Sequence, residues 1–391
     1  MRILFLNHNV IWRSTFFRCY HLGRYLVKKG HQVTIYTIHP TNRLGIEETY
    51  LAGVKVIQFP DLFWGMGRSG WDFWDLVHRL YKVGQENYDL VHAFDSRPVV
   101  IHPALALRKR GVPLFMDWAD WWGRGGVIEE RANKLIKFFL AGIETWYEEH
   151  FRVLAQGTTV ISKALGERAI SLGVSSQQIL RLSGGADVDN FTPLDKKQAR
   201  KSLNLSLDFK ILGFMGFVHY DLDLVLQAFA ILYKRDPKYR LILVGKPSDL
   251  TQRIAKQKGV AEGILEYGIL PYEKISKYMC CADVFLLPFA NKQANIGRWP
   301  NKVGDYMAMG RPIISSPVGE MKELFTNEKI GALVKDEPET FAKAVEEVLQ
   351  NGTKCEQMSR AAREAALKRY SWEFLAARLE KFYHEVLNKK I

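Results

Sequence analysis

The chain has 391 residues, of which 47% are hydrophobic and 25% charged, which excludes a largely disordered or collagen-like protein. Its length predicts two or three domains. Lysine and arginine outnumber aspartate and glutamate by 55 to 42, and this net charge of +13 favours an anionic partner: nucleic acid, an anionic membrane or a phosphorylated ligand. A merely basic surface explains the charge equally well.

Short apolar runs alternate with amphipathic segments along the first half of the chain. We expect strands over residues 2–6, 33–37, 54–59, 90–94, 113–116 and 158–161, and helices over 15–29, 128–155 and 164–172. Ser162 is expected to cap the last of these helices. Strands separated by helices indicate βαβ units and a parallel sheet.

The pattern restarts after a segment over 183–193 that is rich in glycine and aspartate. We expect strands over residues 210–215, 240–244, 264–267, 283–287 and 312–315, and helices over 222–234, 248–258, 272–280, 301–309, 320–325, 337–349, 354–370 and 372–388. We therefore expect the chain to form two successive doubly wound halves. Neither first strand is followed by a Gly-x-Gly-x-x-Gly turn, and the chain has no Walker A motif, which argues against an NAD(P) oxidoreductase and a nucleotide hydrolase.

Compartment and metal content are also suggested by the sequence. No apolar run approaches the roughly 18 residues of a membrane-spanning helix, and the apolar start is too short for a signal peptide. The four cysteines have no metal-binding spacing, and few thiols in a long chain suit a reducing compartment. We therefore expect a cytoplasmic protein with neither a metal nor a cofactor.

Residues 286–316 read as a strand, a polar loop and a helix that opens near Pro300. Lys302 in the first turn, and Arg298 just before it, can face a phosphate. Asp305, one turn further, can accept two hydrogen bonds from a ribose diol. This pattern predicts a site for a nucleotide diphosphate, with an ordinary charged surface helix as the alternative.

Residues 300–314, Pro-Asn-Lys-Val-Gly-Asp-Tyr-Met-Ala-Met-Gly-Arg-Pro-Ile-Ile, resemble the Pro-x-Lys-x-x-Glu-Tyr-Met-Ala-x-Gly-x-Pro-Val signature of family 4 glycosyltransferases. Further matches follow in the family's order at residues 28–35, 159–165, 185–193, 241–245, 282–288 and 370–373. The resemblance implies the α/β GT-B fold, in which two Rossmann-like, doubly wound parallel-sheet domains face a cleft. It divides the chain into an acceptor domain (1–185), a nucleotide-sugar domain (186–370) and a helix crossing back to the first domain (371–391).

The resemblance also implies roles at the donor. Asp305 takes the place of the second acid of the family's Glu-seven-residues-Glu pair and would hold the donor ribose, whereas the first acid is replaced by Gly297. Lys302, with its neighbour Asn301, would lie near the donor phosphates.

The loop after the expected strand 210–215 begins with Gly216 and lacks the arginine and lysine that the family often carries there. Arg298 or His219 would supply that charge instead. The family's base slot uses backbone, which here falls around Gly268 and Leu270. Backbone recognition leaves the base undetermined.

On the acceptor side, Asp117-Trp-Ala-Asp resembles the family's Asp-x-His-Asp or Asp-x-Arg-Asp element. Ala119 replaces the residue that would contact the donor sugar, and Asp120 is the expected catalytic group at the reacting sugar, with a helix cap as the alternative. The family's His-Ala-His element reads His92-Ala-Phe-Asp, a second departure.

Eight of the ten tryptophans fall within the first 150 residues. Most are expected in loops after strands, facing the cleft: Trp12, Trp64, Trp71, Trp74, Trp118, Trp121 and Trp122. We expect Trp12, Arg13, Trp121 and Trp122 to bind the acceptor, since aromatic faces stack on sugar rings. Packing under long loops is the alternative.

The helix expected from residue 128 combines basic and apolar side chains: Arg131, Lys134 and Lys137 with Leu135, Ile136, Phe138 and Phe139. It is suited to lie on an anionic membrane, or equally to form a buried helix edge.

The favoured function is thus a retaining, metal-independent glycosyltransferase that moves a sugar from a nucleotide-sugar to a glycan or lipid-linked acceptor. It would be cytoplasmic or peripheral on the inner face of the membrane. The alternatives are a degenerate relative that binds nucleotide-sugar or glycan without turnover, and a sugar-nucleotide epimerase. No nucleic-acid partner is expected, since no recognition motif accompanies the charge.

Overall fold

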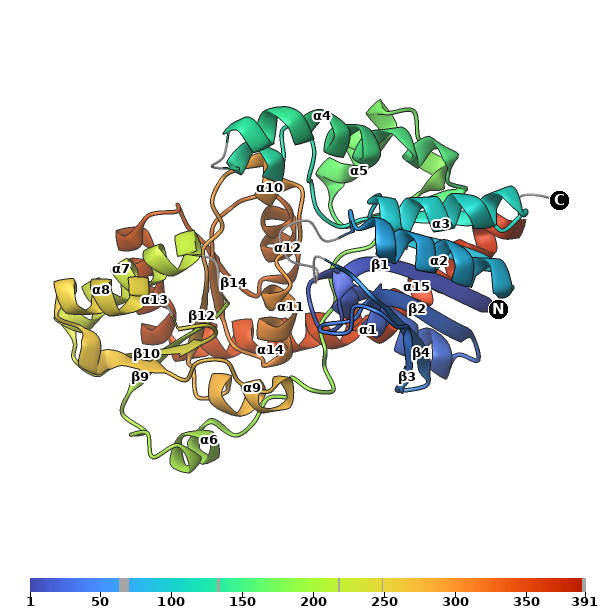
Figure 1. The fold of residues 1–391 in the computed structure, drawn as a ribbon. Coiled ribbons are helices and arrows are strands. Elements are labelled where there is room, and N and C mark those ends of the chain that lie inside the picture. Colours follow the sequence, from blue (N-terminus) through green and yellow to red (C-terminus); the bar gives the residue numbers. More distant parts are fainter. Residues whose placement is uncertain (63–69, 132–133, 217–218, 248, 389–391) are drawn as a thin grey trace. The chain divides into compact units, whose positions relative to one another are not determined.

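The computed structural model describes residues 1–62, 70–131, 134–216, 219–247 and 249–388 and forms two units, each built on its own sheet (Figure 1). The first unit contains Met1–Gly184, Ile296–Trp299 and Trp372–Ile391. The second contains Gly185–Asn295 and Pro300–Ser371. The short segment Ile296–Trp299 thus belongs to the first unit although the chain around it belongs to the second.

The sheet of the first unit has the order β3-β4-β2-β1-β5-β6-β7-β8. Its strands are β1 (Arg2–Val10), β2 (Gln32–Ile38), β3 (Glu47–Leu51), β4 (Val54–Phe59), β5 (Leu90–Phe94), β6 (Leu114–Trp118), β7 (Gly157–Val160) and β8 (Ile179–Arg181). All strand pairs are parallel except β3–β4, an antiparallel hairpin at one edge. The carboxyl ends of β1, β5 and β6 therefore lie next to one another along one edge of the sheet.

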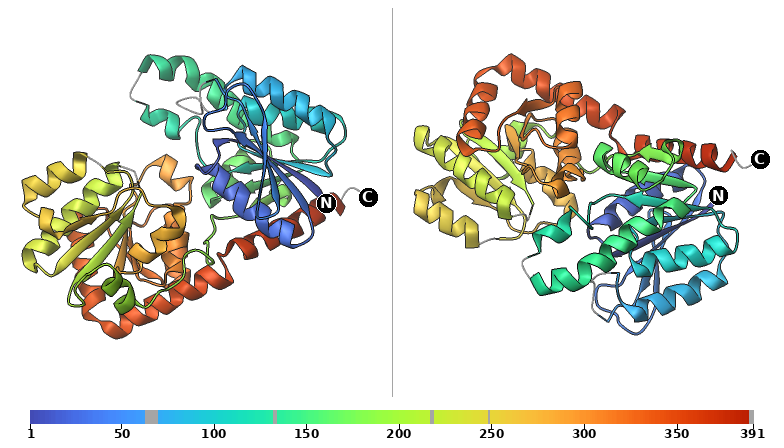
Figure 2. Two further views of the ribbon diagram at one scale, coloured as in Figure 1. Left: turned by 60° about the horizontal axis from the view of Figure 1, so that its bottom comes forward. Right: turned by 90° about the horizontal axis from the view of Figure 1, so that it is seen from above.

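Helices cover both faces of this sheet. They are α1 (Thr15–Lys28), α2 (Phe73–Gln85), α3 (Pro98–Lys109), α4 (Lys134–His150), α5 (Lys163–Ser171) and α15 (Trp372–Asn388), with short 3-10 turns η1 (Val127–Glu130), η2 (Arg152–Leu154) and η3 (Ser176–Gln178). Figure 2 shows α15, in red, lying beside α1, in blue. Ile3 and Phe5 of β1 pack with side chains of α1 and α15, whereas Leu4 and Leu6 pack with those of α2 and α3. This alternation follows from the two-residue period of a strand whose faces are both buried.

The second unit has a parallel sheet of order β11-β10-β9-β12-β13-β14. The strands are β9 (Lys210–Met215), β10 (Tyr239–Val244), β11 (Ile264–Glu266), β12 (Val284–Leu287), β13 (Ile313–Ser315) and β14 (Gly331–Leu333). The helices are α6 (Lys196–Ser202), α7 (His219–Arg235), α8 (Asp249–Lys258), α9 (Tyr272–Met279), α10 (Gln293–Ile296), α11 (Lys302–Ala308), α12 (Glu320–Glu328), α13 (Pro338–Gln350) and α14 (Gly352–Lys368), with the turn η4 (Ala261–Gly263).

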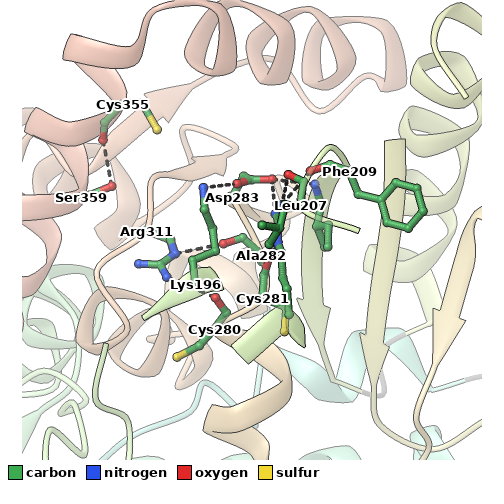
Figure 3. A network of polar contacts seen from close by, with 12 residues as sticks. Lys196, Leu207, Phe209, Cys280, Cys281, Ala282, Asp283, Arg311, Cys355 and Ser359 are labelled. Carbon is green, nitrogen blue, oxygen red and sulfur yellow. Dashed lines mark hydrogen bonds and ion pairs between the residues drawn. The ribbon is translucent and has the colours of Figure 1, made fainter. Parts of the chain in front are cut away.

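A network around Asp283 fastens α6 to this second sheet (Figure 3). The Asp283 carboxylate accepts hydrogen bonds from Lys196 Nζ at 2.6 Å, from the buried Arg200 guanidinium at 2.7 Å and from the Ile211 N–H at 2.8 Å. Arg200 also donates to the carbonyl oxygens of Cys281, Leu207 and Phe209. The network satisfies backbone groups where β9 and β12 begin.

The expected two halves, each with a parallel sheet, are confirmed. The single helix expected over 128–155 is wrong, because η1, α4 and η2 divide that region. The strands β3, β8 and β14 and the helices α2, α3, α6 and α10 were not expected. Ser162 is the predicted cap, since its Oγ accepts the Leu165 N–H at 3.2 Å.

Candidate active site

Two carboxylates meet at the carboxyl edge of the first sheet. Asp95 directly follows β5, and Asp120 lies two residues beyond β6, the neighbouring strand. They line one small cavity together with Thr15, Asp117, Trp118, Ala119 and Trp122. No described helix begins at Asp120, and the next turn starts at Val127, so the helix-cap interpretation of Asp120 is wrong.

The two carboxyl groups differ in their protonation. Burial raises the pKa of Asp120 to about 7; Arg298 lowers this pKa, while the charge of Asp95 adds to the increase. Burial also works against ionisation of Asp95, but the charge of Arg97 and the hydrogen bond from the Ser96 N–H favour it, and the pKa of Asp95 lies below its ordinary value. Near neutral pH, Asp95 is therefore ionised while Asp120 is divided between its two forms.

Asp95 is a site residue that motif comparison did not select. It has a φ of 90°, an uncommon conformation for a residue other than glycine, which costs about 1–3 kcal/mol and is concentrated at functional sites. The Ser96 N–H donates to Asp95 Oδ1 at 2.6 Å, and His8 Nδ1 lies 3.4 Å from Oδ2. The signal available in the sequence was its position immediately after an expected strand next to the one that precedes Asp120.

The four predicted acceptor residues have different surroundings in the structure. Trp122 lines the cavity of Asp120, with the Arg97 guanidinium 4.8 Å from the centroid of its ring, whereas Trp121 donates from Nε1 to the Arg124 carbonyl at 2.8 Å. Trp12 and Arg13 are exposed in the loop between β1 and α1.

The expectation that the other tryptophans follow strands is partly wrong. Trp118 is the buried last residue of β6, and Trp74 lies within α2. Trp71 precedes α2 and packs on Tyr147 at a centroid distance of 5.1 Å. Trp64 lies outside the described residues.

In the second unit, Lys302 faces the turn after β9. Its Nζ lies 3.6 Å from Asp221 Oδ2 and 4.3 Å from the centroid of the Phe214 ring. A Cβ added to Gly216, whose φ is 140°, would lie 3.0 Å from this Nζ. The structure thus brings together Gly216 and Lys302, two residues that the sequence assigned to the donor. The side chain of His219 lies outside the described part of the chain.

Asp305 lies on the seven-residue helix α11 with Lys302. Burial raises the pKa of Asp305 well above its ordinary value, and the nearby Asp187 raises it further. The Asp187 backbone N–H donates to the Asp305 carboxyl group. Asn301 precedes the helix, is exposed, and makes no capping hydrogen bond through its side chain.

Beside this group, a small cavity opens at the carboxyl ends of β9 and β10. It is lined by Phe214, Gly216, Leu222, Leu243, Val244, Gly245, Lys246, Thr251 and Glu266. Of the two residues predicted for the base slot, Gly268 adjoins this cavity through its carbonyl, which accepts the Gly245 N–H at 2.9 Å, and Leu270 does not line it. Sequence reasoning missed Lys246 and Thr251, which belong to no recognisable motif.

Arg298 belongs to the first unit with the other residues of Ile296–Trp299. The charge of Arg298 favours the ionised form of Asp120. The preceding residue, Gly297, holds the segment in place, since its carbonyl accepts the Ser162 hydroxyl at 2.8 Å.

Comparison with known proteins identifies the family. The family described as Glycosyl transferases group 1 matches residues 195–365, and Glycosyltransferase Family 4 matches residues 17–190. This chain belongs to the family 4 glycosyltransferases. The curated D-inositol 3-phosphate glycosyltransferase of Corynebacterium urealyticum is 26% identical to it over 224 residues, which are 54% of this chain and 51% of that protein. The chain thus spans about half the length of this curated relative.

Solved structures confirm the GT-B fold of this glycosyltransferase. Sucrose-phosphate synthase from Thermosynechococcus elongatus superimposes with a TM-score of 0.78 at 17% identity, covering 100% of both chains. The Anabaena protein HepE in complex with UDP-glucose gives a TM-score of 0.70 at 15% identity, covering 98% of this chain and 100% of that one.

No cluster of three or more histidine, cysteine, aspartate or glutamate side chains within the described residues is arranged to hold a metal ion. No helix in the same residues combines the length and apolar character that crossing a membrane requires.

Proposed function

We propose that this glycosyltransferase moves a sugar from a nucleotide-sugar donor to a glycan or lipid-linked acceptor, with retention of configuration and without a metal. The observation that carries the proposal is the convergence of the Lys302 ammonium group on the Gly216 turn at the carboxyl end of β9. Open parallel sheets bind their ligands at this edge. HepE, which shares the fold, was solved with UDP-glucose.

Lys302 suits the leaving diphosphate of such a donor. When the bond from the sugar to the diphosphate breaks, negative charge develops on the phosphate oxygens, and a cation already in place stabilises it. The carboxylate of Asp221, 3.6 Å from Nζ, keeps the ammonium group at the turn before a ligand arrives. This fixed charge lets the reaction proceed without a metal.

Asp120 is the proposed catalytic group at the reacting sugar. A carboxyl group with a pKa of about 7 can hold or release a proton near neutral pH, which general acid–base chemistry requires. In the same cavity the indole of Trp122 offers an aromatic face for a sugar ring. With Trp12, Arg13 and Trp121, it forms the proposed acceptor side.

We also propose that the protein works in the cytoplasm, peripherally on the membrane. The outer side of α4 supports this, because Phe138 is 79% exposed and Ile143 and Trp146 are about half exposed. The cations near the start of this helix are ion-paired: Arg131 with Glu144, and Lys137 with Glu129. Co-sedimentation with anionic vesicles at low salt tests the idea, and failure to pellet would refute it.

A second candidate is a protein that binds nucleotide-sugar without turnover. The absence of the first motif acid favours it, since position 297 carries a glycine and therefore offers no carboxylate. Release of nucleotide from UDP-, GDP- and ADP-sugars separates the two candidates. Turnover supports the enzyme, while a thermal shift with nucleotide but no release supports the binder.

The donor site is tested by a thermal-shift screen with nucleotides and nucleotide-sugars. Asp305→Ala should abolish the shift given by the wild-type protein. The matched control is Asp208→Ala, which removes an exposed carboxylate from the same unit. An unchanged shift in Asp305→Ala would remove Asp305 from the donor site.

A further inference from the structure

The helix α4 presents its polar side to the loop that carries Asp120. Glu148 is only 2% exposed, and its carboxylate accepts three hydrogen bonds from this loop. Oε1 accepts the Trp118 indole N–H at 3.1 Å and the Trp122 backbone N–H at 2.7 Å, and Oε2 accepts the Gly123 N–H at 2.6 Å. The three donors come from both sides of Asp120, so one carboxylate fixes both ends of its loop.

The fit between helix and loop is close. A Cβ added to Gly123 would lie 2.3 Å from Glu148 Oε2, so the loop needs a glycine at this point. Thr145, one turn earlier on α4, accepts the Arg124 N–H through Oγ1 at 3.0 Å. The same face of α4 therefore binds consecutive backbone N–H groups of the loop.

The charge of Glu148 is also compensated. Arg168 lies 3.6 Å from Oε2, and Arg152 stacks over the Trp118 ring, with its guanidinium carbon 3.7 Å from the centroid. Arg152 Nε donates to the Glu148 carbonyl at 2.8 Å. A buried carboxylate with several N–H donors and two nearby cations is held in one position, because each partner restricts its rotamer.

The buried side of α4 carries polar as well as apolar side chains. Glu144 and Thr145 are buried with Glu148, whereas Phe138 is 79% exposed and Trp146 is 48% exposed. On the same helix, Tyr147 packs against the apolar core of the first unit. One part of the buried side of α4 therefore packs in the core, and another part satisfies the backbone of the loop.

We propose that Glu148 is a positioning residue that fixes the loop 119–123 so that Asp120 faces the cavity it shares with Asp95. The proposal rests on the proposed function, in which Asp120 acts at the reacting sugar. Glu148 itself lies outside the lining of that cavity.

Glu148→Gln tests the proposal, because glutamine keeps the shape but replaces one accepting oxygen with an NH₂ group. The matched control is Glu149→Gln, which removes the next carboxylate on α4 and its ion pair with Arg168. With UDP-glucose as the donor and release of UDP as the measure of turnover, we expect kcat to fall at least about tenfold in Glu148→Gln, with KM for UDP-glucose within about twofold. Glu149→Gln should stay within about threefold of the wild-type kcat.

A second readout does not depend on turnover. The Asp120 carboxyl carbon can be titrated by NMR in protein labelled at aspartate, with Asp120→Asn to assign its signal. We expect its midpoint, about 7 in the wild-type protein, to fall in Glu148→Gln because a neighbouring negative charge is removed, and to stay in place in Glu149→Gln. If Glu148→Gln fails to fold, Gly123→Ala disturbs the same contact from the loop side and should also move the midpoint.

A wild-type kcat together with an unmoved midpoint in Glu148→Gln would overturn the positioning role. An equal effect in Glu149→Gln would also overturn it, because the carboxylate of Glu149 pairs with Arg168 and not with loop 119–123. Absence of nucleotide release by the wild-type protein from every nucleotide-sugar would instead refute the proposed function, and the titration would still decide the role of Glu148.

Discussion

Asp95 and Asp120 line the same cavity of the first unit, yet their pKa values are displaced in opposite directions. Arg97 and the Ser96 N–H favour the charge of Asp95 despite its burial, whereas burial and the charge of Asp95 disfavour that of Asp120. Paired carboxyl groups with separated pKa values are the usual arrangement when one must be ionised and the other must carry a proton. Because these pKa values affect the free energy of unfolding, they can be tested without knowing the substrate.

Asp120→Asn should stabilise the protein at high pH. The pKa of Asp120 is about 7 in the folded state against 3.8 for an ordinary aspartate, so the folded state binds more protons between these values. The free energy of unfolding therefore declines as pH rises from about 4 to 7, and asparagine removes this loss. We expect Tm to rise by several degrees at pH 8 and to be unchanged at pH 4. Equal Tm differences at the two pH values would contradict this.

Asp95→Asn should have the opposite pH dependence. The pKa of Asp95 lies below its unfolded value, so its ionised form contributes stability that is present above the unfolded pKa and is lost as pH falls through the folded pKa. We expect Asp95→Asn to lower Tm at pH 7, with the difference shrinking as the pH approaches 3. Thermal unfolding followed by circular dichroism measures both variants, and a difference that grows in acid would count against the assignment.

Much of this architecture could be predicted because local patterns carry it. Apolar strand runs alternate with helical periodicity, and the carboxyl ends of neighbouring parallel strands share an edge. That rule places Asp120, which follows β6, beside Asp95, which follows the neighbouring strand β5. It also places Lys302, which follows β12, near Gly216, which follows the neighbouring strand β9. The cap at Ser162 is equally local.

Other features depend on contacts that no local pattern encodes. Hydropathy would turn Phe138 inward and Glu148 outward, and the structure does the reverse because the indole of Trp118 and two backbone N–H groups need an acceptor. The placement of Arg298 in the first unit depends on a hydrogen bond between residues 135 positions apart, Ser162 and Gly297. The backbone conformation of Asp95 is likewise a tertiary property.

Arg18→Met should be among the most destabilising substitutions in the first unit. Arg18 and Asp117 are both buried and form a forked pair with two N–O distances of 3.0 Å, and Arg18 also donates to the carbonyls of Leu182 and Ser183 at 2.8 Å. Removing one partner leaves the Asp117 charge buried without compensation, at a cost of about 3–5 kcal/mol. Urea denaturation measures this loss.

The control for Arg18 is Lys381→Met on α15 of the same unit. Lys381 and Glu385 form an exposed pair at 3.7 Å, and such pairs contribute at most about 0.5 kcal/mol. A loss below about 1 kcal/mol in Arg18→Met, or similar losses in both variants, would show that the buried pair does not stabilise the unit.

Gly304→Ala should disturb the helix that carries Lys302 and Asp305. A Cβ at position 304 would lie 2.4 Å from the Gly185 carbonyl oxygen, and this neighbour is backbone, so α11 itself must shift. Overpacking of this kind costs about 1–3 kcal/mol, and the shift should also weaken the thermal response to UDP.

The control is Gly142→Ala on the exposed side of α4, where a Cβ meets nothing within 4 Å and the gain in helix propensity is about 0.5–1 kcal/mol. Differential scanning fluorimetry with and without UDP compares the two variants. Wild-type stability and UDP response in Gly304→Ala would mean that the contact between α11 and the segment at Gly185 does not hold the donor residues in place.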